Sequence, residues 1–140
     1  MILASTSVAD IVLSLTAAGA YLVPAAAGER LGMPQRRLAA VVAWLLHASV
    51  LGWMLFGDDP RFGFAPALSV TAWLVLTVYA VEQEVFPQLR LRWGLAVLGA
   101  AAVLLAMVFP GTPRHPAASP LLPLHLALGI ASYGLFAASV

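Results

Sequence analysis

Apolar residues occupy this chain in long continuous runs separated by short polar turns. Five runs approach the length of a membrane-spanning helix, which needs about 20 mainly apolar residues. They are residues 8–27, 38–56, 65–83, 93–109 and 120–140. None of them alternates polar with apolar residues, and an open sheet edge in lipid leaves backbone groups without hydrogen-bond partners. The pattern predicts an all-α, polytopic transmembrane helix bundle that forms a single membrane domain over residues 1–140.

The turns between the runs are short, so we expect consecutive helices to be antiparallel neighbours. Arginine counts in these turns indicate the orientation, because cytoplasmic loops carry the excess of basic residues. The first and third loops hold five arginines, whereas the second and fourth hold two; in chain order these are Arg30, Arg36, Arg37, Arg90 and Arg92 against Arg61 and Arg114. The count predicts an external N-terminus and, after five crossings, a cytoplasmic C-terminus.

The first run has a second interpretation. Residues 11–23, followed by the small residues of 24–28, resemble the apolar region and cleavage site of a signal peptide. No basic residue precedes the run, and Asp10 is the only charge there, which favours a membrane span.

Composition supports the bilayer as the main partner of the chain. Hydrophobic residues make up 62% of the 140 positions and charged residues only 9%, against about 25% charged in a typical soluble domain. The net charge of +1 leaves no basic patch for nucleic acid. The chain has no cysteine, which excludes disulfides and thiolate metal sites. No nucleophile–base motif or Gly-rich phosphate loop occurs, so we expect no enzymatic activity.

His47 stands nine residues from either end of the second run, about 13 Å from each. Trp44 and Leu51 share its helical face. An ionisable residue at membrane depth is a functional candidate by default, and imidazole is a common ligand of metals and haem iron. Two interpretations stay open. His47 is a ligand or proton relay, or it is a neutral histidine hydrogen-bonded to a hydroxyl or carbonyl of a neighbouring helix.

His125 lies five residues into the fifth run, near its external end. Gly129 and Ser132 continue the same face. Gly129 gives room for a flat ligand or for close approach of another helix, and Ser132 offers a hydrogen bond to either. The depths of His47 and His125 differ by roughly 6 Å, which favours two separate sites over one shared metal. Met54 and Met107 are weak candidates for a second ligand.

Several other side chains have ordinary expected roles. The adjacent carboxylates of Asp58 and Asp59 either bind a cation or face solvent. Trp73 lies nearer the middle of the membrane in the predicted third span, and it is assigned to core packing or to a cavity wall. Aromatic residues toward the helix ends are interpreted as interfacial anchors, namely Tyr21, Trp53, Tyr79 and Trp93.

Three stretches together resemble a known family. The first is Trp-Leu-Leu-His-Ala at 44–48. The second is Phe-Gly-Phe-Ala-Pro-Ala-Leu-Ser at 62–69, which runs into Ala-Trp-Leu at 72–74. The third is Leu-His-Leu at 124–126, which continues through Gly129 to Ser132 and Tyr133. In order and spacing they resemble the cytochrome c assembly family of haem-handling membrane proteins (CcsA/CcmC-like), most closely its YpjD-like branch.

This resemblance implies a multi-pass protein of the bacterial inner membrane that binds haem for c-type cytochrome maturation, alongside other cytochrome c assembly proteins. His47 matches the buried haem-ligating histidine of the family, and His125 the outward-facing one. Trp44, Gly129 and Ser132 are then candidates to line the haem pocket, with no metal beyond the haem iron. Family members are about twice as long, so the chain is expected to be an N-terminal half.

Two other functions remain open from the sequence. One is a subunit or fragment of a small-solute transporter in which His47 relays protons. The other is a purely structural membrane subunit that binds no ligand.

Overall fold

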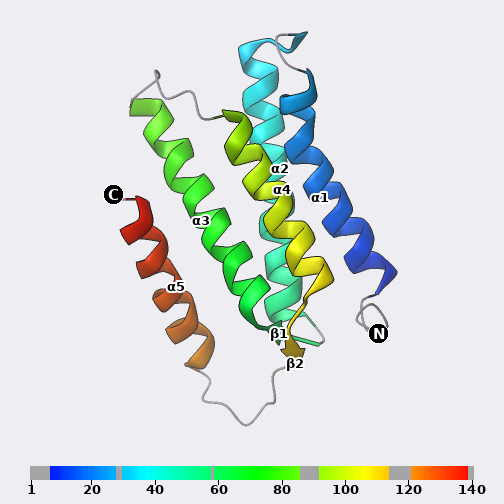
Figure 1. Cartoon of the computed structure of the whole chain (residues 1–140), viewed down its shortest axis with the longest axis vertical. Helices are drawn as coiled ribbons and strands as arrows, with labels where there is room; N and C mark the ends of the chain where they lie inside the picture. The colour runs from blue at the N-terminus through cyan, green and yellow to red at the C-terminus, as the bar shows by residue number, and fades with distance from the viewer. Residues whose placement is uncertain (1–6, 28–29, 58, 86–91, 114–120, 139–140) are drawn as a thin grey trace.

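The described residues of the chain form five helices that run alternately up and down, as the computed structural model in Figure 1 shows. The structure describes residues 7–27, 30–57, 59–85, 92–113 and 121–138. Two strands of two residues each complete the set. The elements are α1 (Val8–Ala27), α2 (Met33–Phe56), β1 (Arg61–Phe62), α3 (Phe64–Val85), α4 (Arg92–Val108), β2 (Thr112–Pro113) and α5 (Leu122–Ala138). The all-α class is therefore confirmed.

Helix boundaries agree with the apolar runs except at the start of α2. This helix begins at Met33, five residues before the predicted start at residue 38. Pro34 has its φ fixed near the helical value and needs no backbone donor in the first turn. The side chain of Gln35 accepts a hydrogen bond from the N–H of Gly32 at 2.9 Å. Local start signals thus extend the helix into a polar segment that hydropathy alone does not include.

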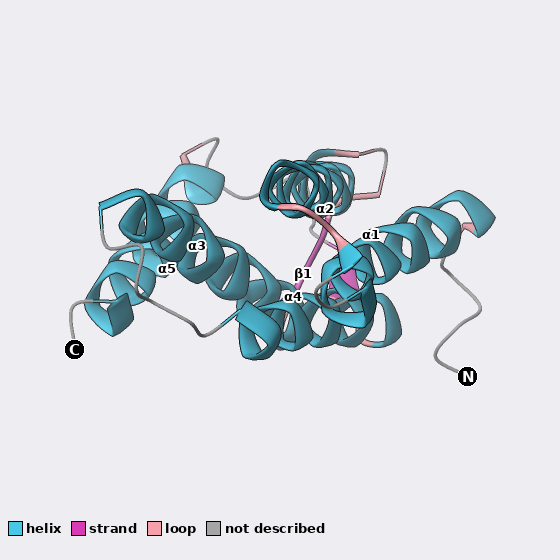
Figure 2. Ribbon diagram, turned by 90° about the horizontal axis from the view of Figure 1, so that it is seen from above, coloured by secondary structure: helices cyan, strands magenta, loops and turns pink. Residues whose placement is uncertain are grey.

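The helices pack as a bundle with one peripheral member. Helix α1 contacts α2 and α4, and α3 contacts α4 and α5. Both views place α5 at the edge of the bundle beside α3 (Figures 1 and 2). Gly134 lies at this contact, where a Cβ would be 3.4 Å from Cβ of Leu74 on α3, an ordinary packing distance. The expectation that α4 and α5 are neighbours is wrong for the described residues, where α5 packs on α3 instead.

A small strand pair ties two loops together at one end of the bundle. β1 pairs antiparallel with β2, with Arg61 opposite Pro113 and Phe62 opposite Thr112. Gly111 directly precedes β2 and has a φ of +82°. Residues with a Cβ rarely adopt this backbone conformation, so a glycine suits the turn that brings β2 to β1. The sequence did not predict these strands, since each is only two residues long.

Small residues form the core between α1, α2 and α4. The buried cluster contains one aromatic residue and several alanines and valines: Ala17, Ala18, Tyr21, Ala43, Val50, Ala100 and Val103. Such residues let helix backbones approach closely.

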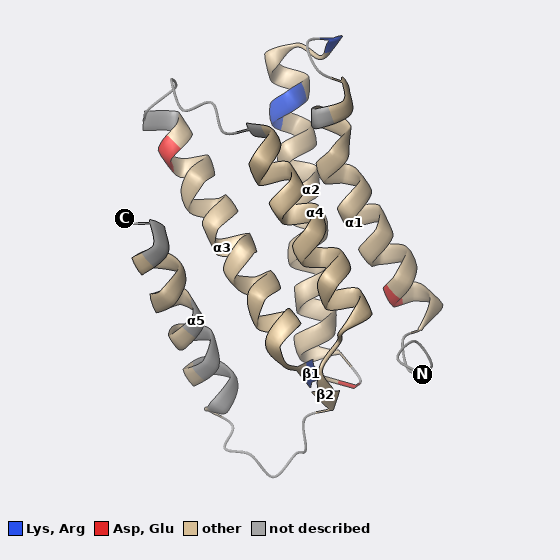
Figure 3. Cartoon of the chain, viewed as in Figure 1, with Lys and Arg blue, Asp and Glu red and all other residues tan. Residues whose placement is uncertain are grey.

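The outer surface of the bundle is strongly apolar. Residues Met33–Phe56 and Phe64–Gln83 are each long and apolar enough to cross a membrane, and only 22% of each apolar window is buried inside the protein. The apolar stretches Val8–Pro24 and Trp93–Val108 are shorter. The charged residues that the structure describes lie at the two ends of the bundle (Figure 3). Two helices therefore have the character of membrane spans.

Candidate functional site

The imidazole of His47 connects three helices in the interior of the bundle. His47 on α2 has no exposed surface. Its Nδ1 lies 3.1 Å from the hydroxyl of Tyr21 on α1, and its Nε2 lies 2.9 Å from the hydroxyl of Ser69 on α3. Ser69 is also fully buried, and Tyr21 nearly so. A polar triad, Tyr21–His47–Ser69, therefore sits in otherwise apolar surroundings.

Every polar atom of this triad has a partner. A neutral imidazole offers one N–H donor and one lone pair, and a hydroxyl can serve either as donor or as acceptor. One hydroxyl therefore accepts from the ring N–H of His47 while the other donates to the second nitrogen. Burying a polar group without a hydrogen bond is costly, so this arrangement accounts for a histidine at such depth. It is the hydrogen-bonded alternative that the sequence left open.

The position of Tyr21 depends on a glycine of α4. A Cβ at Gly99 would lie 2.9 Å from two carbons of the Tyr21 ring. The ring therefore lies directly against the backbone of α4. It also meets the His47 ring edge-on, with centroids 5.7 Å apart and an interplanar angle of 90°. The expectation that Tyr21 is an interfacial anchor is wrong, because its hydroxyl has a buried partner and its ring fits a space that a glycine provides.

A second network joins α2 and α3 one turn away from the triad. The indoles of Trp44 and Trp73 stack with centroids 4.8 Å apart. The indole N–H of Trp44 donates to the hydroxyl of Thr77 at 2.8 Å, and that of Trp73 donates to the carbonyl of Trp44 at 3.2 Å. Thr77 in turn donates to the carbonyl of Trp73. Both half-buried indoles are thus held in fixed positions beside His47.

The surroundings of His47 do not fit haem iron as they stand. An axial ligand must direct the lone pair of one ring nitrogen at the metal, but hydroxyls occupy both nitrogens of His47. In the part of the chain that the structure describes, no three His, Asp or Glu residues are grouped closely enough to hold a metal ion.

His125 has a different environment. Its side chain is exposed, near the start of α5. Its helix packs against α3 alone among the described elements, so His125 and His47 belong to separate parts of the bundle. A Cβ at Gly129 would meet nothing within 4 Å, which rules out close approach of a described helix at this glycine. Ser132 donates to the carbonyl of Gly129 in its own helix at 2.7 Å. The exposed imidazole of His125 therefore lies one helical turn from a glycine that has open space beside it.

Sequence reasoning found His47 and Trp44 but missed the residues that hold them. Ser69 was noted only as part of a resembling stretch, Trp73 was assigned to core packing or to a cavity wall without its partner Trp44, and Thr77 was not noted. Their common signal is spacing: all three lie on one face of α3, four residues apart. The side chains of Arg90, Arg92 and Arg114, used for the predicted orientation, lie outside the described residues, as does Asp58.

No protein-family model matches this chain, and no curated protein or solved structure is significantly similar to it.

Proposed function

We propose that this chain is the membrane-embedded part of a haem-handling protein of c-type cytochrome biogenesis in the bacterial inner membrane. Haem is its cargo, and other cytochrome c assembly proteins are its partners. All five helices are 17–24 residues long, within the range of about 17–25 that spans a bilayer. The proposal therefore includes five crossings, with the end that carries Arg30, Arg36 and Arg37 in the cytoplasm.

One observation supports the family assignment most directly. The two internal stretches that resemble the family touch each other at both of their distinctive residues. His47 bonds Ser69, and Trp44 stacks on Trp73. His47 and Ser69 stand 22 positions apart in the sequence, and Trp44 and Trp73 stand 29 positions apart. In each pair the first residue lies on α2 and the second on α3. Residues that appear as isolated matches in the sequence thus form one structural unit between α2 and α3.

Within this proposal the two histidines have different roles. His125 is the ligand that this chain offers to haem iron, because its imidazole is exposed beside the open surface at Gly129. An imidazole of this kind supplies one axial position, and the second ligand comes from elsewhere. His47 is a positioning residue that joins α1, α2 and α3 through its two hydrogen bonds.

The test compares haem content in three histidine variants. The chain is produced in a haem-replete bacterial host and purified in mild detergent, and its haem is quantified by Soret absorbance. We expect His125→Ala to lose most of the bound haem. His47→Gln keeps a donor and an acceptor for Tyr21 and Ser69, so it should keep the haem. His115→Ala serves as the control for removal of a histidine as such.

The results separate the parts of the proposal. Absence of haem from the unaltered chain would contradict haem handling by this chain. Loss of haem in His47→Gln with retention in His125→Ala would instead make His47 the iron ligand, through a rearrangement of its hydroxyl partners. An effect of His115→Ala equal to that of His125→Ala would show that the loss is not specific.

A second candidate function follows from the triad itself. Hydroxyl, imidazole and hydroxyl lie in a row from α1 to α3, an arrangement that can pass a proton if the ring exchanges its tautomer. In that case the protein is part of a proton-coupled transporter. Reconstituted vesicles with a pH-sensitive dye test this function. Proton flux that disappears in His47→Gln and persists in His125→Ala favours it, and absence of flux excludes it.

A further inference from the structure

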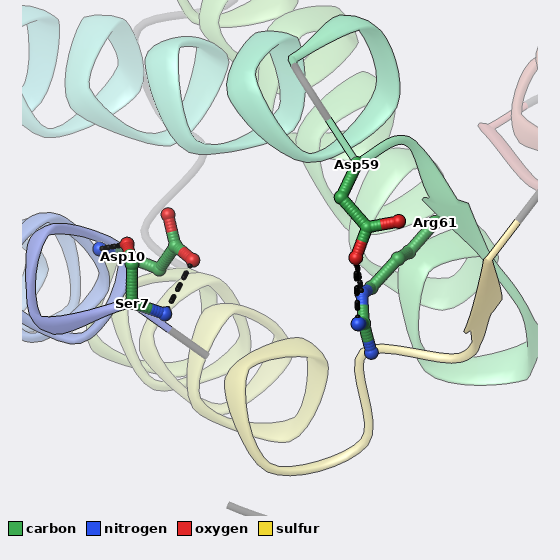
Figure 4. A network of polar contacts seen from close by, with 4 residues as sticks. All are labelled: Ser7, Asp10, Asp59 and Arg61. Carbon is green, nitrogen blue, oxygen red and sulfur yellow. Dashed lines mark hydrogen bonds and ion pairs between the residues drawn. The ribbon is translucent and has the colours of Figure 1, made fainter. Parts of the chain in front are cut away.

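A cavity opens at the end of the bundle opposite Arg36 and Arg37, between α1, α2 and α4. Its volume is about 240 Å³. Apolar and sulfur-containing side chains form most of its wall, including Trp53 and Met54 from α2 and Met107 from α4. Its polar lining residues are Ser7, Asp10, Ser14, Asp59 and Arg61, and Figure 4 shows four of them, Ser7, Asp10, Asp59 and Arg61. Neither the triad nor His125 is part of this cavity.

One carboxylate oxygen of Asp10, a residue that lines the cavity, has no partner among the described residues. Oδ2 of Asp10 accepts a hydrogen bond from the backbone N–H of Ser7 at 2.9 Å, and the hydroxyl of Ser7 accepts one from the N–H of Asp10. This reciprocal pair caps α1 and fixes the carboxylate. Oδ1 of Asp10 is buried and has no hydrogen-bond partner in the part of the chain that the structure describes. A buried, unpaired carboxylate oxygen is costly, so its presence at a cavity points to a ligand that pairs with it.

The charges around the cavity favour a cation. Arg61 is engaged with Asp59, whose Oδ2 accepts from its guanidinium at 2.7 and 3.0 Å. The charges of Asp59 and Arg61 therefore neutralise each other. The carboxylate of Asp10 remains as the uncompensated charge among the described lining residues, so a guest with one positive charge complements the site.

We propose that this cavity binds a small organic cation with an ammonium head and a short apolar body. The ammonium pairs with Oδ1 of Asp10, while the indole of Trp53 and the thioethers of Met54 and Met107 contact the apolar body. The volume lies below the roughly 300–1,000 Å³ typical of pockets for drug-sized ligands, which limits the guest to a few heavy atoms. A hydrated inorganic ion would leave the apolar wall without a partner.

The test uses three probes of similar shape and different charge. These are n-butylammonium, 1-pentanol and pentanoate, titrated by calorimetry into the chain in lipid nanodiscs, with empty nanodiscs as the blank. We expect saturable binding of n-butylammonium only. Asp10→Asn should weaken it about ten-fold or more, because the amide removes the charge but still accepts the N–H of Ser7. Glu82→Gln removes a carboxylate at the other end of the bundle and should leave the affinity unchanged.

Each other result overturns the proposal. Equal binding of 1-pentanol would make the cavity a general apolar site. Equal affinity in Asp10→Asn would exclude the carboxylate as the recognising group, and full competition by sodium chloride at equal concentration would assign the site to an inorganic cation. Absence of saturable binding would leave the cavity without this function. The haem measurements do not depend on the cavity, so the two proposals can fail independently.

Discussion

The hydroxyl of Ser69 on α3 lies 2.9 Å from Nε2 of His47 on α2, and both residues are completely buried. This bond joins two helices whose mutual contact is less extensive than that of α2 with α1 or of α3 with α4 and α5. Since Tyr21 of α1 binds the opposite ring nitrogen, the imidazole links three helices through two hydrogen bonds. Removal of the imidazole should therefore affect the packing of all three helices rather than one contact.

Ser69→Ala should lower the free energy of unfolding by about 1–3 kcal/mol, the cost of leaving a buried polar atom without its partner. Reversible unfolding in mixed dodecyl maltoside and sodium dodecyl sulfate micelles measures this. The matched control is Ser49→Ala. The hydroxyl of Ser49 is exposed and bonds only the carbonyl of Leu45 in its own helix, so its loss should cost little. Equal effects of the two substitutions would contradict a structural role for the bond to His47.

Two glycine substitutions should act in opposite directions. Gly99→Ala places a methyl group 2.9 Å from the Tyr21 ring, which cannot move without disturbing its bond to His47. We expect a loss of about 1–3 kcal/mol, typical of an overpacked core. Gly19→Ala on α1 meets nothing within 4 Å and should be neutral, or stabilising by up to about 1 kcal/mol, because alanine favours the helix. Thermal unfolding of the two variants beside the unaltered chain measures the direction of each change in stability. A Gly99→Ala variant as stable as the unaltered chain would contradict a tight contact between Gly99 and the Tyr21 ring.

The sequence predicted the helices well because their signal is the length of an apolar run, a local property. It did not predict the contacts that organise the site. Tyr21 was assigned to the membrane interface by its position in the run, but its location depends on Gly99, 78 positions later in the chain. His47 was recognised because a histidine stands out in an apolar segment, whereas Ser69 is an ordinary residue until the fold brings it to the ring.

The tryptophan pair depends on a threonine hydroxyl. Thr77→Val keeps the shape of the side chain but removes the acceptor of the Trp44 indole N–H. We expect a loss of about 1 kcal/mol and a changed near-ultraviolet circular dichroism signal, because the Trp44–Trp73 stack loses one of its supports. Thr16→Val is the control, since the exposed hydroxyl of Thr16 bonds only the carbonyl of Val12 in its own helix. An unchanged spectrum in Thr77→Val would indicate that stacking alone holds the indoles.

The proposed five crossings can be tested with single cysteines, because the natural chain contains none. Thr112 is exposed on β2, at the end proposed to be external, and Met33 is exposed at the start of α2, at the end proposed to be cytoplasmic. Neither substitution changes the charge on which the orientation depends. In intact spheroplasts a membrane-impermeant maleimide should label Thr112→Cys, and Met33→Cys should react only after permeabilisation. The reverse result would keep the spans but invert the orientation. Labelling of both cysteines from one side would contradict the crossing by α2 itself, because α2 and the β1–β2 pair separate the two positions along the bundle axis.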